Sequence, residues 1–287
     1  MTGCGGALIS NTQELQIGKG VDQQLKKEYG LVKSSDPVAK WAKDFIGPLI
    51  KASSPFRNPK EVEGYRVAVI ANDKLVNAFA APGGYTYIST GLILKSKDCA
   101  EIAGVMGHEL AHVTQRHGAI AIEKAFAFQQ IIGFFLEDGI GADAALLIFQ
   151  FLQNTKFSRT DESEADSVGL QISHDAGYDP GGLADFFSVL LKGSKGSMPE
   201  FFSSHPATAS RIDSVKSQIR NRYGRKKNKK LSRKCRTKMS LAEVKKHIRS
   251  GKLRITKATG VAKEKRARAL KQLEALRKKR KKANKPK

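Results

Sequence analysis

The sequence predicts a mainly helical α+β domain that contains a small sheet and is followed by a basic C-terminal extension. Three observations lead to this prediction. Apolar residues recur at helical spacing through most of the first 220 residues, strand-like runs lie between residues 65 and 89, and the charge changes abruptly near residue 220. At 287 residues, the chain is long enough for one or two domains.

Two helices are expected before the sheet. Apolar residues at every fourth position from Ile17 to Tyr29 indicate the first helix. The pair Asp36-Pro37 is typical of a capped helix start, and an apolar stripe follows it.

The sheet is expected to contain residues 65–70, 76–81 and 85–89, with a turn at Pro82-Gly83-Gly84 between the last two strands. An edge strand of such a sheet can pair with an extended peptide. A hairpin that only completes the sheet fits the same pattern, and the sequence favours neither interpretation.

A His-Glu-x-x-His pattern lies in a run that favours a helix beginning at Asp98, with Glu101 closing a capping box. Residues four apart share one face of a helix, so His108 and His112 can present nitrogens to one Zn²⁺ at about 2.0–2.1 Å. Glu109 lies one step round the helix, where it can take a proton from a water. The pattern predicts a zinc hydrolase.

A third ligand is expected from residues 157–177, which indicate a second capped helix. Glu162 and Asp166 are four residues apart and share a face, so one can bind zinc while the other orients a histidine. Spacing alone does not decide which carboxylate is the ligand. Glu164 points roughly to the opposite side.

Further helices are expected from the apolar segments that flank this pair. Residues 125–152 are strongly apolar, but they divide into runs that are too short for a membrane span. Core helices packed on the zinc helix are the favoured interpretation, and an apolar flap over the cleft or at a membrane surface is the alternative. Residues 183–191 and 212–219 indicate two more buried helices.

Four segments together resemble a known group, the HtpX-like, BepA-like and CAAX-prenyl-protease-like zinc metallopeptidases, which are gluzincins. The resemblance covers roughly residues 8–220. It is carried by NAFAAPGGYTYISTGLI at 77–93, GVMGHELAHVTQRHG at 104–118, FSRTDESEADSVGL at 157–170 and SSHPATASRI at 203–212.

The resemblance implies a zincin-type fold with one Zn²⁺ per chain. In that group the first Glu of an E-x-x-A-D pattern is the third ligand, which implies Glu162 as ligand and Asp166 as its partner behind a histidine. It also implies that His205 is a site residue, either an extra ligand in a closed state or a transition-state donor, with Arg211 as a support. His117, His174 and His247 are expected to be surface or helix-end histidines.

The implied activity is hydrolysis of peptide bonds by an endopeptidase, with Glu109 as the base. The resemblance suggests protein quality control that acts on unfolded, misassembled or membrane-associated proteins. The alternative is a latent protease that acts as a chaperone or as an adaptor anchored to a polyanion. Glu109 argues against this alternative, because a purely structural metal site does not need that carboxylate.

The charge divides the chain in two. The net charge is +24, yet residues 220–287 alone carry 30 of the 51 Lys and Arg residues and three of the 27 acids, a net of +27. Residues 1–219 carry a net of −3. We therefore expect a catalytic domain at 1–222 and an extension at 223–287. The last expected row of buried apolar residues in the domain ends with Ile219.

The extension at 223–287 is expected to be helical or disordered. Its Lys and Arg runs are typical of segments that bind nucleic acid or acidic lipid nonspecifically, and they also occur as solvated ends. Few aromatic residues interleave them, so base stacking is not expected.

The three cysteines, Cys4, Cys99 and Cys235, are far apart and odd in number, so no disulfide framework is expected. The start MTGCGG resembles a lipoprotein cleavage site, although no complete signal peptide precedes it. Either the given sequence is truncated or has a wrong start, or the resemblance at Cys4 is accidental. We favour the former and expect a periplasmic or membrane-attached protein.

Overall fold

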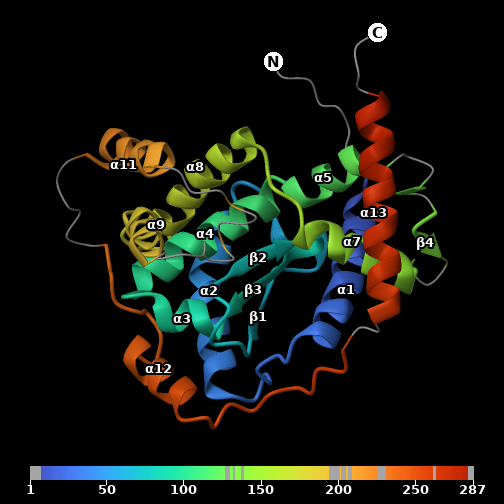
Figure 1. Ribbon diagram of the computed structural model, residues 1–287. Helices are drawn as coiled ribbons and strands as arrows, with labels where there is room; N and C mark the ends of the chain where they lie inside the picture. The colour runs from blue at the N-terminus through green and yellow to red at the C-terminus, as the bar shows by residue number, and fades with distance from the viewer. Residues whose placement is uncertain are drawn as a thin grey trace.

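The structure is a computed structural model, and it describes residues 8–126, 130–131, 133–136, 139–193, 201, 205, 209–224, 231–260 and 263–283. Its helices surround a small sheet (Figure 1), which confirms the predicted mainly helical α+β class. The described helices are α1 (Asn11–Glu28), α2 (Pro37–Ser53), α3 (Thr90–Lys95), α4 (Cys99–Thr114), α5 (His117–Ala125), α7 (Ala142–Gln153), α8 (Arg159–Asp175), α9 (Gly182–Gly193), α11 (Ala209–Tyr223), α12 (Leu241–Arg249) and α13 (Lys263–Ala283).

The central sheet has the strand order β1-β3-β2, which leaves β2 at an edge. Its strands are β1 (Arg66–Ile70), β2 (Ala78–Ala81) and β3 (Tyr85–Ser89), close to the predicted ranges. Strand β1 pairs with β3 in parallel, and β2 pairs with β3 antiparallel. Gly83 and Gly84 make the turn with φ of 73° and 81°, a left-handed conformation that glycine adopts without a steric penalty.

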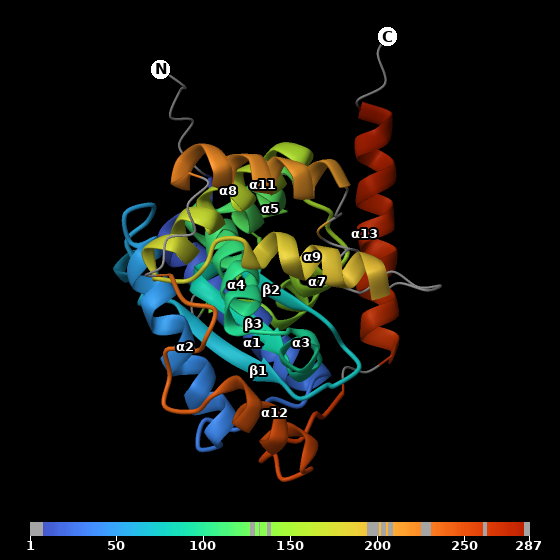
Figure 2. The ribbon, with the colours of Figure 1, turned by 90° about the vertical axis from the view of Figure 1, so that its left-hand side faces the viewer.

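Two apolar clusters hold the helices on the sheet. The first contains side chains of α2, α4, α8 and α9, and the second contains side chains of α1, α7 and α13. Figures 1 and 2 show these two groups on opposite sides of the sheet. All residues of α4 are buried, so the His-Glu-x-x-His segment sits on a helix that is packed on every side.

Helices α4 and α8 approach each other closely at two glycines. A Cβ atom added to Gly169 would lie 2.7 Å from the backbone nitrogen of His108, and one added to Gly107 would lie 2.7 Å from the carbonyl oxygen of Gly169. Such distances are too short for a side chain. The two glycines therefore set the separation between the histidine helix and the Glu162 helix.

The caps of these helices follow the sequence with one difference. Ser158 and Asp161 form a reciprocal capping box at α8, as predicted. Asp98 caps α4 by accepting the N–H of Glu101. The Glu101 carboxylate, however, accepts the N–H of Lys97 at 2.8 Å, so the expected capping box is not closed.

Residues 231–260 pack along the body of the molecule. Val244 and Ile248 of α12 are buried in the same cluster as α4, and Val32 forms a β-bridge with Ile255. The expectation that apolar burial ends with Ile219 is therefore wrong, because sequence spacing gave no sign of these contacts. The division at residue 222 into two domains stays a prediction.

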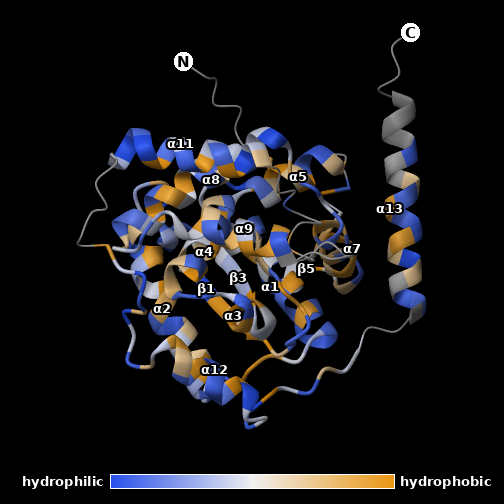
Figure 3. Cartoon of the chain, turned by 60° about the vertical axis from the view of Figure 1, so that its left-hand side comes forward, coloured by the Kyte–Doolittle hydropathy of each residue, from blue (hydrophilic) through white to orange (hydrophobic). Residues whose placement is uncertain are grey.

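Helix α13 lies against α7, and its C-terminal end projects beyond the body (Figure 1). Ala269 and Leu273 are buried in this contact. Hydrophilic residues predominate over the rest of α13 (Figure 3). Helix α7 supplies the apolar part of the segment at 142–153, and it packs mainly against α1 and α13. Among the described helices, none combines the length and apolar character needed to cross a bilayer.

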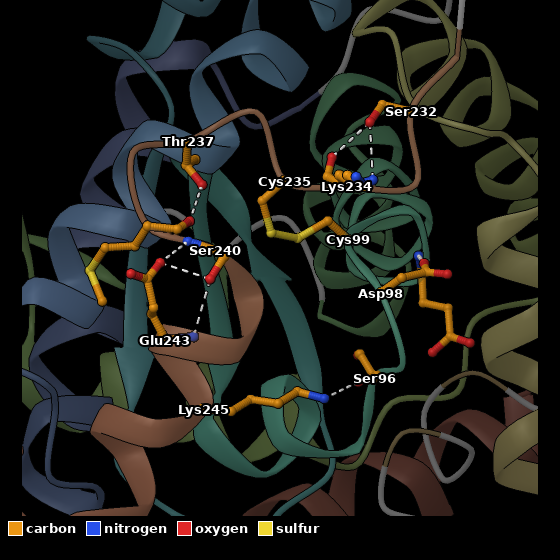
Figure 4. Close-up of a disulfide and its surroundings, with 12 residues drawn as sticks. Ser96, Asp98, Cys99, Ser232, Lys234, Cys235, Thr237, Ser240, Glu243 and Lys245 are labelled. Carbon is orange, nitrogen blue, oxygen red and sulfur yellow. Dashed lines mark hydrogen bonds between the residues drawn. A yellow bond between two sulfur atoms is a disulfide. The ribbon is translucent and has the colours of Figure 1, made fainter. Parts of the chain in front are cut away.

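A disulfide joins Cys99, the first residue of α4, to Cys235 (Figure 4). This corrects the expectation that the cysteines form no disulfide, because residues 136 positions apart in sequence meet in the fold. Beside it, Arg233 pairs with Asp98, Asp179 and Asp185 at 2.7–2.9 Å. Cys4, the residue of the lipoprotein-like start, lies outside the described residues.

Candidate metal centre and active site

Helix α4 places His108 and His112 one turn apart on the face that meets α8. Their Nε2 atoms are 3.1 Å apart, and both side chains are almost fully buried. Burial lowers the pKa of both imidazoles, that of His112 most strongly. Both rings are therefore neutral near pH 7, and each can offer a lone pair.

Glu162 of α8 and His205 complete a group of four donors. The Glu162 carboxylate lies 3.5 Å from His112 Nε2 and 3.6 Å from His108 Nε2. His205 Nδ1 lies 3.2 Å from His108 Nε2 and 2.8 Å from Glu162 Oε1. Ligand atoms of all four residues lie within 4.8 Å of one another.

These donors fit one zinc ion. A tetrahedral zinc with bonds of about 2.0–2.1 Å holds its ligand atoms about 3.3 Å apart. Most of the distances between these donor atoms fall within a few tenths of an ångström of that value. Burial by itself raises the pKa of Glu162, but the neighbouring His205 and His112 outweigh it and lower the pKa, so this carboxylate is charged.

Asp166 and Arg211 lie behind the donors. Asp166 Oδ1 is 3.0 Å from His108 Nδ1, on the side of the ring away from the cluster. Arg211 of α11 donates to both oxygens of Asp166 at 2.7 and 2.8 Å. Its third guanidinium nitrogen lies 2.5 Å from Glu162 Oε2. The structure thus brings Glu162 and Asp166 to one arginine, with Glu162 facing the donors.

Glu109 lies beside the donor group on the sheet side of α4. Its carboxylate is buried, lies 3.5 Å from His205 Nε2 and accepts the backbone N–H of Ala80 in the edge strand β2. Burial raises the pKa of Glu109 to about 7, against the lowering effect of His205. A carboxylate with a pKa in this range can both accept and return a proton near neutral pH.

A cavity of about 230 Å³ opens next to these residues. Glu109, His112 and His205 line one part of it, and the edge strand β2 and helix α7 line the rest. Its apolar wall includes side chains from several elements, namely Leu75, Phe79, Phe149, Leu152 and Phe157. The cavity therefore combines the edge strand of the sheet, apolar walls and the candidate base.

Three site residues were missed by the sequence reasoning. Phe157 and Phe201 both stack on the ring of His205, with ring centroids at 5.6 and 5.0 Å. His117 lies at the start of α5, a helix end as one of the two predictions had it, but it is buried and contacts His112, which the sequence did not indicate. The available signal was that His117 follows His112 by five residues. A residue at that spacing reaches the site only if the helix ends or bends between the two histidines.

All predicted site residues therefore gather in one place, although Ser204 and Pro206 of the Ser-His-Pro motif lie outside the described residues. A zinc-compatible group of nitrogen and carboxylate donors, with a buried Glu beside it and a cavity at a sheet edge, defines a site of the zinc metallopeptidase class. Residues 39–219 match the family model of Peptidase family M48, and the chain belongs to this family.

Individual relatives agree with this assignment. The chain is 28% identical over 228 residues to the putative beta-barrel assembly-enhancing protease of Vibrio cholerae, covering 75% of this chain and 46% of that protein. It is 31% identical over 209 residues to the mitochondrial metalloendopeptidase OMA1 of Arabidopsis thaliana, covering 68% and 42%. It is 31% identical over 156 residues to the metalloprotease LoiP of Escherichia coli, covering 51% of this chain and 60% of that protein. The chain thus spans less than half the length of the first two relatives.

Proposed function

We propose that this chain is a zinc-dependent metalloendopeptidase that cleaves misfolded or membrane-associated proteins in protein quality control. The observation that carries the proposal is the group of four buried donors, spaced for one zinc ion, with Glu109 directly beside it. Family membership supports the reaction class, and the names of the relatives, which include proteases of barrel assembly and of mitochondria, support the biological role.

In the proposed mechanism, His108, His112 and Glu162 hold the zinc ion. When bound, the ion supplies a Lewis acid that polarises a carbonyl and lowers the pKa of a water. Glu109 takes a proton from the attacking water and returns it to the leaving amine. Asp166 fixes the orientation of His108, and Arg211 holds the carboxylates of Asp166 and Glu162 in place by pairing with both.

His205 is proposed to be a fourth donor in a resting state. Its Nδ1 lies among the other donors, at the place that a reacting oxygen would need. The aromatic rings of Phe157 and Phe201 hold it there. Movement of His205 away from the donors then opens the site.

The substrate is proposed to bind as an extended strand along β2. The edge strand β2 provides backbone groups for pairing, and the adjoining cavity accepts an apolar side chain. Because extended segments with exposed apolar residues are common in unfolded chains, this geometry favours unfolded protein as the substrate class.

We further propose a periplasmic or membrane-attached location. The lipoprotein-like start around Cys4 supports it, and so does the disulfide between Cys99 and Cys235, because structural disulfides persist mainly in oxidising compartments. The extension at 223–287 is proposed to bind polyanions such as acidic lipid or nucleic acid through its net charge of +25, from 28 Lys and Arg residues and three acids.

Metal analysis combined with cleavage of casein, with and without a chelator, tests the function. The wild-type chain is expected to hold one zinc and to lose activity with the chelator. Glu109→Gln keeps the size of the side chain but removes the base, so turnover should fall by about 10²–10⁴-fold with zinc retained. Unchanged turnover in this variant would exclude the mechanism.

The ligand assignment is tested by comparing two neighbouring carboxylates. Glu162→Ala is expected to lose most of the zinc, because it removes a donor. Asp166→Ala is expected to weaken binding by about 10–100-fold, as loss of a group behind a ligand does. Full zinc in Glu162→Ala and none in Asp166→Ala would reverse the two roles.

A further inference from the structure

Three side chains in contact with one another run from the four metal-donor residues toward the surface. His112 Nδ1 lies 2.9 Å from His117 Nδ1, and His117 Nε2 lies 3.4 Å from Glu164 Oε2. His117 is buried, with 4% of its surface exposed, whereas about half of the Glu164 side chain is exposed. The mechanism proposed above uses neither His117 nor Glu164.

The protonation pattern of this chain follows from the geometry. His112 Nε2 faces the other donors and must offer a lone pair to bind a metal, so the ring proton lies on Nδ1. The Nδ1–H then needs an acceptor, and its contact is His117 Nδ1. His117 therefore carries its own proton on Nε2, where the Glu164 carboxylate accepts it. The contact with Glu164 thus fixes the tautomer of His117, and the contact with His117 fixes the tautomer of His112.

The backbone is shaped to make this contact. Helix α4 ends at Thr114, and Arg116 then adopts a left-handed conformation with φ of 58°, which few non-glycine residues do. The bend turns the chain so that His117 begins α5 and faces His112. The Arg116 side chain is held at the bend by Glu14, at 2.8 Å from its Nε. Strain of this kind persists where surrounding contacts enforce it, and it often serves a site.

We propose that His117 is a positioning residue for the metal ligand His112, with Glu164 as the group that orients His117. The two zinc-facing histidines then have separate supports: Asp166 with Arg211 behind His108, and His117 with Glu164 behind His112. Metal-binding histidines almost always donate their second N–H to a carboxylate, carbonyl or water, and here a second imidazole takes that place. The inference rests on the proposed role of His112 as a zinc ligand.

Zinc affinity of the full chain, measured by competition with a chelator, tests the inference. His117→Ala leaves the buried N–H of His112 without an acceptor, and we expect about 10–100-fold weaker binding of zinc. His117→Asn retains an amide oxygen that can accept this proton, so its affinity should lie between those of His117→Ala and the wild type. Glu164→Gln keeps an acceptor for His117 and should stay within a few-fold of the wild type.

The matched control is His174→Ala. His174 also contacts a carboxylate, Asp175 at 2.9 Å, and stacks on the ring of Tyr223, but it lies about three turns along α8 from Glu162. We expect unchanged zinc affinity. Unfolding of the zinc-free variants, followed by circular dichroism, separates loss of positioning from loss of folding. If His117→Ala does not fold, the affinity of His117→Asn, which fills the same space with a polar group, decides.

The visible spectrum of the cobalt-substituted chain gives a second readout. The band positions and intensities report the geometry of the metal ligands, so they should change in His117→Ala and stay unchanged in His174→Ala. Wild-type zinc affinity and an unchanged cobalt spectrum in His117→Ala would overturn the inference while leaving the proposed function intact. Retention of zinc by His112→Ala would instead overturn the ligand set, and with it both proposals.

Discussion

His205 lies among the proposed zinc ligands, since its Nδ1 is 3.2 Å from His108 Nε2 and 2.8 Å from Glu162 Oε1. If it is a resting-state donor, His205→Ala should raise the basal cleavage of unfolded substrate several-fold, because three ligands remain and the fourth position opens. The measurement is the initial rate of casein cleavage at equal zinc content.

The opposite result has its own meaning. A fall in turnover of about 10²–10³-fold in His205→Ala would indicate that His205 stabilises the oxyanion in the transition state. Unchanged turnover would contradict both roles. Phe201→Leu loosens one of the two rings that hold His205, and under the resting-state role it should raise the basal rate in the same direction but by less.

At the scale of residues, the sequence was most informative where function depends on local spacing. His108, Glu109 and His112 follow from helical periodicity alone, because positions four apart share a face. His205 and Arg211 were reached only through the resemblance. His117 was missed because its place depends on a left-handed residue at Arg116, and no rule of spacing predicts such a bend.

The contact between α4 and α8 decides whether the carboxylate of Glu162 reaches the histidines. Gly169→Ala would put a Cβ 2.7 Å from the backbone nitrogen of His108, which is too close unless one of the two helices moves. We expect a loss of about 1–3 kcal/mol in the free energy of unfolding, as overpacking causes, together with weaker zinc binding. Urea unfolding and chelator competition measure the two effects.

Gly47→Ala is the control for this substitution. Gly47 lies within α2 on an exposed face, and a Cβ there meets nothing within 4 Å. Alanine is the better helix former, but Pro48 follows and crowds a Cβ at position 47, so the two effects oppose each other. We expect a change of less than about 1 kcal/mol in the free energy of unfolding and unchanged zinc binding. A similar outcome for both variants would mean that the close approach of α4 and α8 is not required.

The elements themselves were largely predictable. Strands β1, β2 and β3 and the starts of α2, α4 and α8 follow from caps and apolar periodicity, which are local signals. The pairing of Cys99 with Cys235 and the burial of Val244 were not predictable, because they depend on contacts between segments far apart in sequence. Spacing along the chain carries no information about such contacts.

The whole molecule is expected to depend on the part of the chain beyond α11. A chain ending after Tyr223 loses Val244 and Ile248, which are buried at 0% and 3% exposure. Burial of such side chains stabilises by about 1.5–3 kcal/mol each, so the loss of these two alone should cost up to about 3–6 kcal/mol. Urea unfolding of this chain and of the full chain measures the difference.

A chain ending after residue 260 separates the contributions. It keeps α12, the disulfide and the bridge between Val32 and Ile255. Of the elements that the structure describes it loses α13, in which Ala269 and Leu273 are buried. We expect it to lose less stability than the chain ending after Tyr223. Equal stability of the full chain and the chain ending after Tyr223 would instead support independent folding of residues 1–222.

The surplus charge of the molecule lies in the same extension, and α13 presents part of it away from the body (Figure 1). Arg268, Lys271 and Lys278 are exposed on this helix. If α13 binds polyanions, replacing these three side chains with Gln should weaken binding to duplex DNA or anionic vesicles. It should also reduce the slope of log affinity against log salt by about one unit for each phosphate that the variant no longer neutralises.

The control removes the same charge from another face. Lys40, Lys43 and Lys51 are exposed on α2, and their replacement with Gln changes the net charge equally. If overall charge alone drives binding, the two triple variants will weaken it alike. If α13 is the contact, only the triple variant of α13 will bind more weakly. Binding of the full chain to DNA will then show little sequence preference, because contacts to phosphates carry no sequence information. Binding that is indifferent to salt in the full chain would exclude a polyanion site on the extension, since release of counterions by Lys and Arg requires a steep salt dependence.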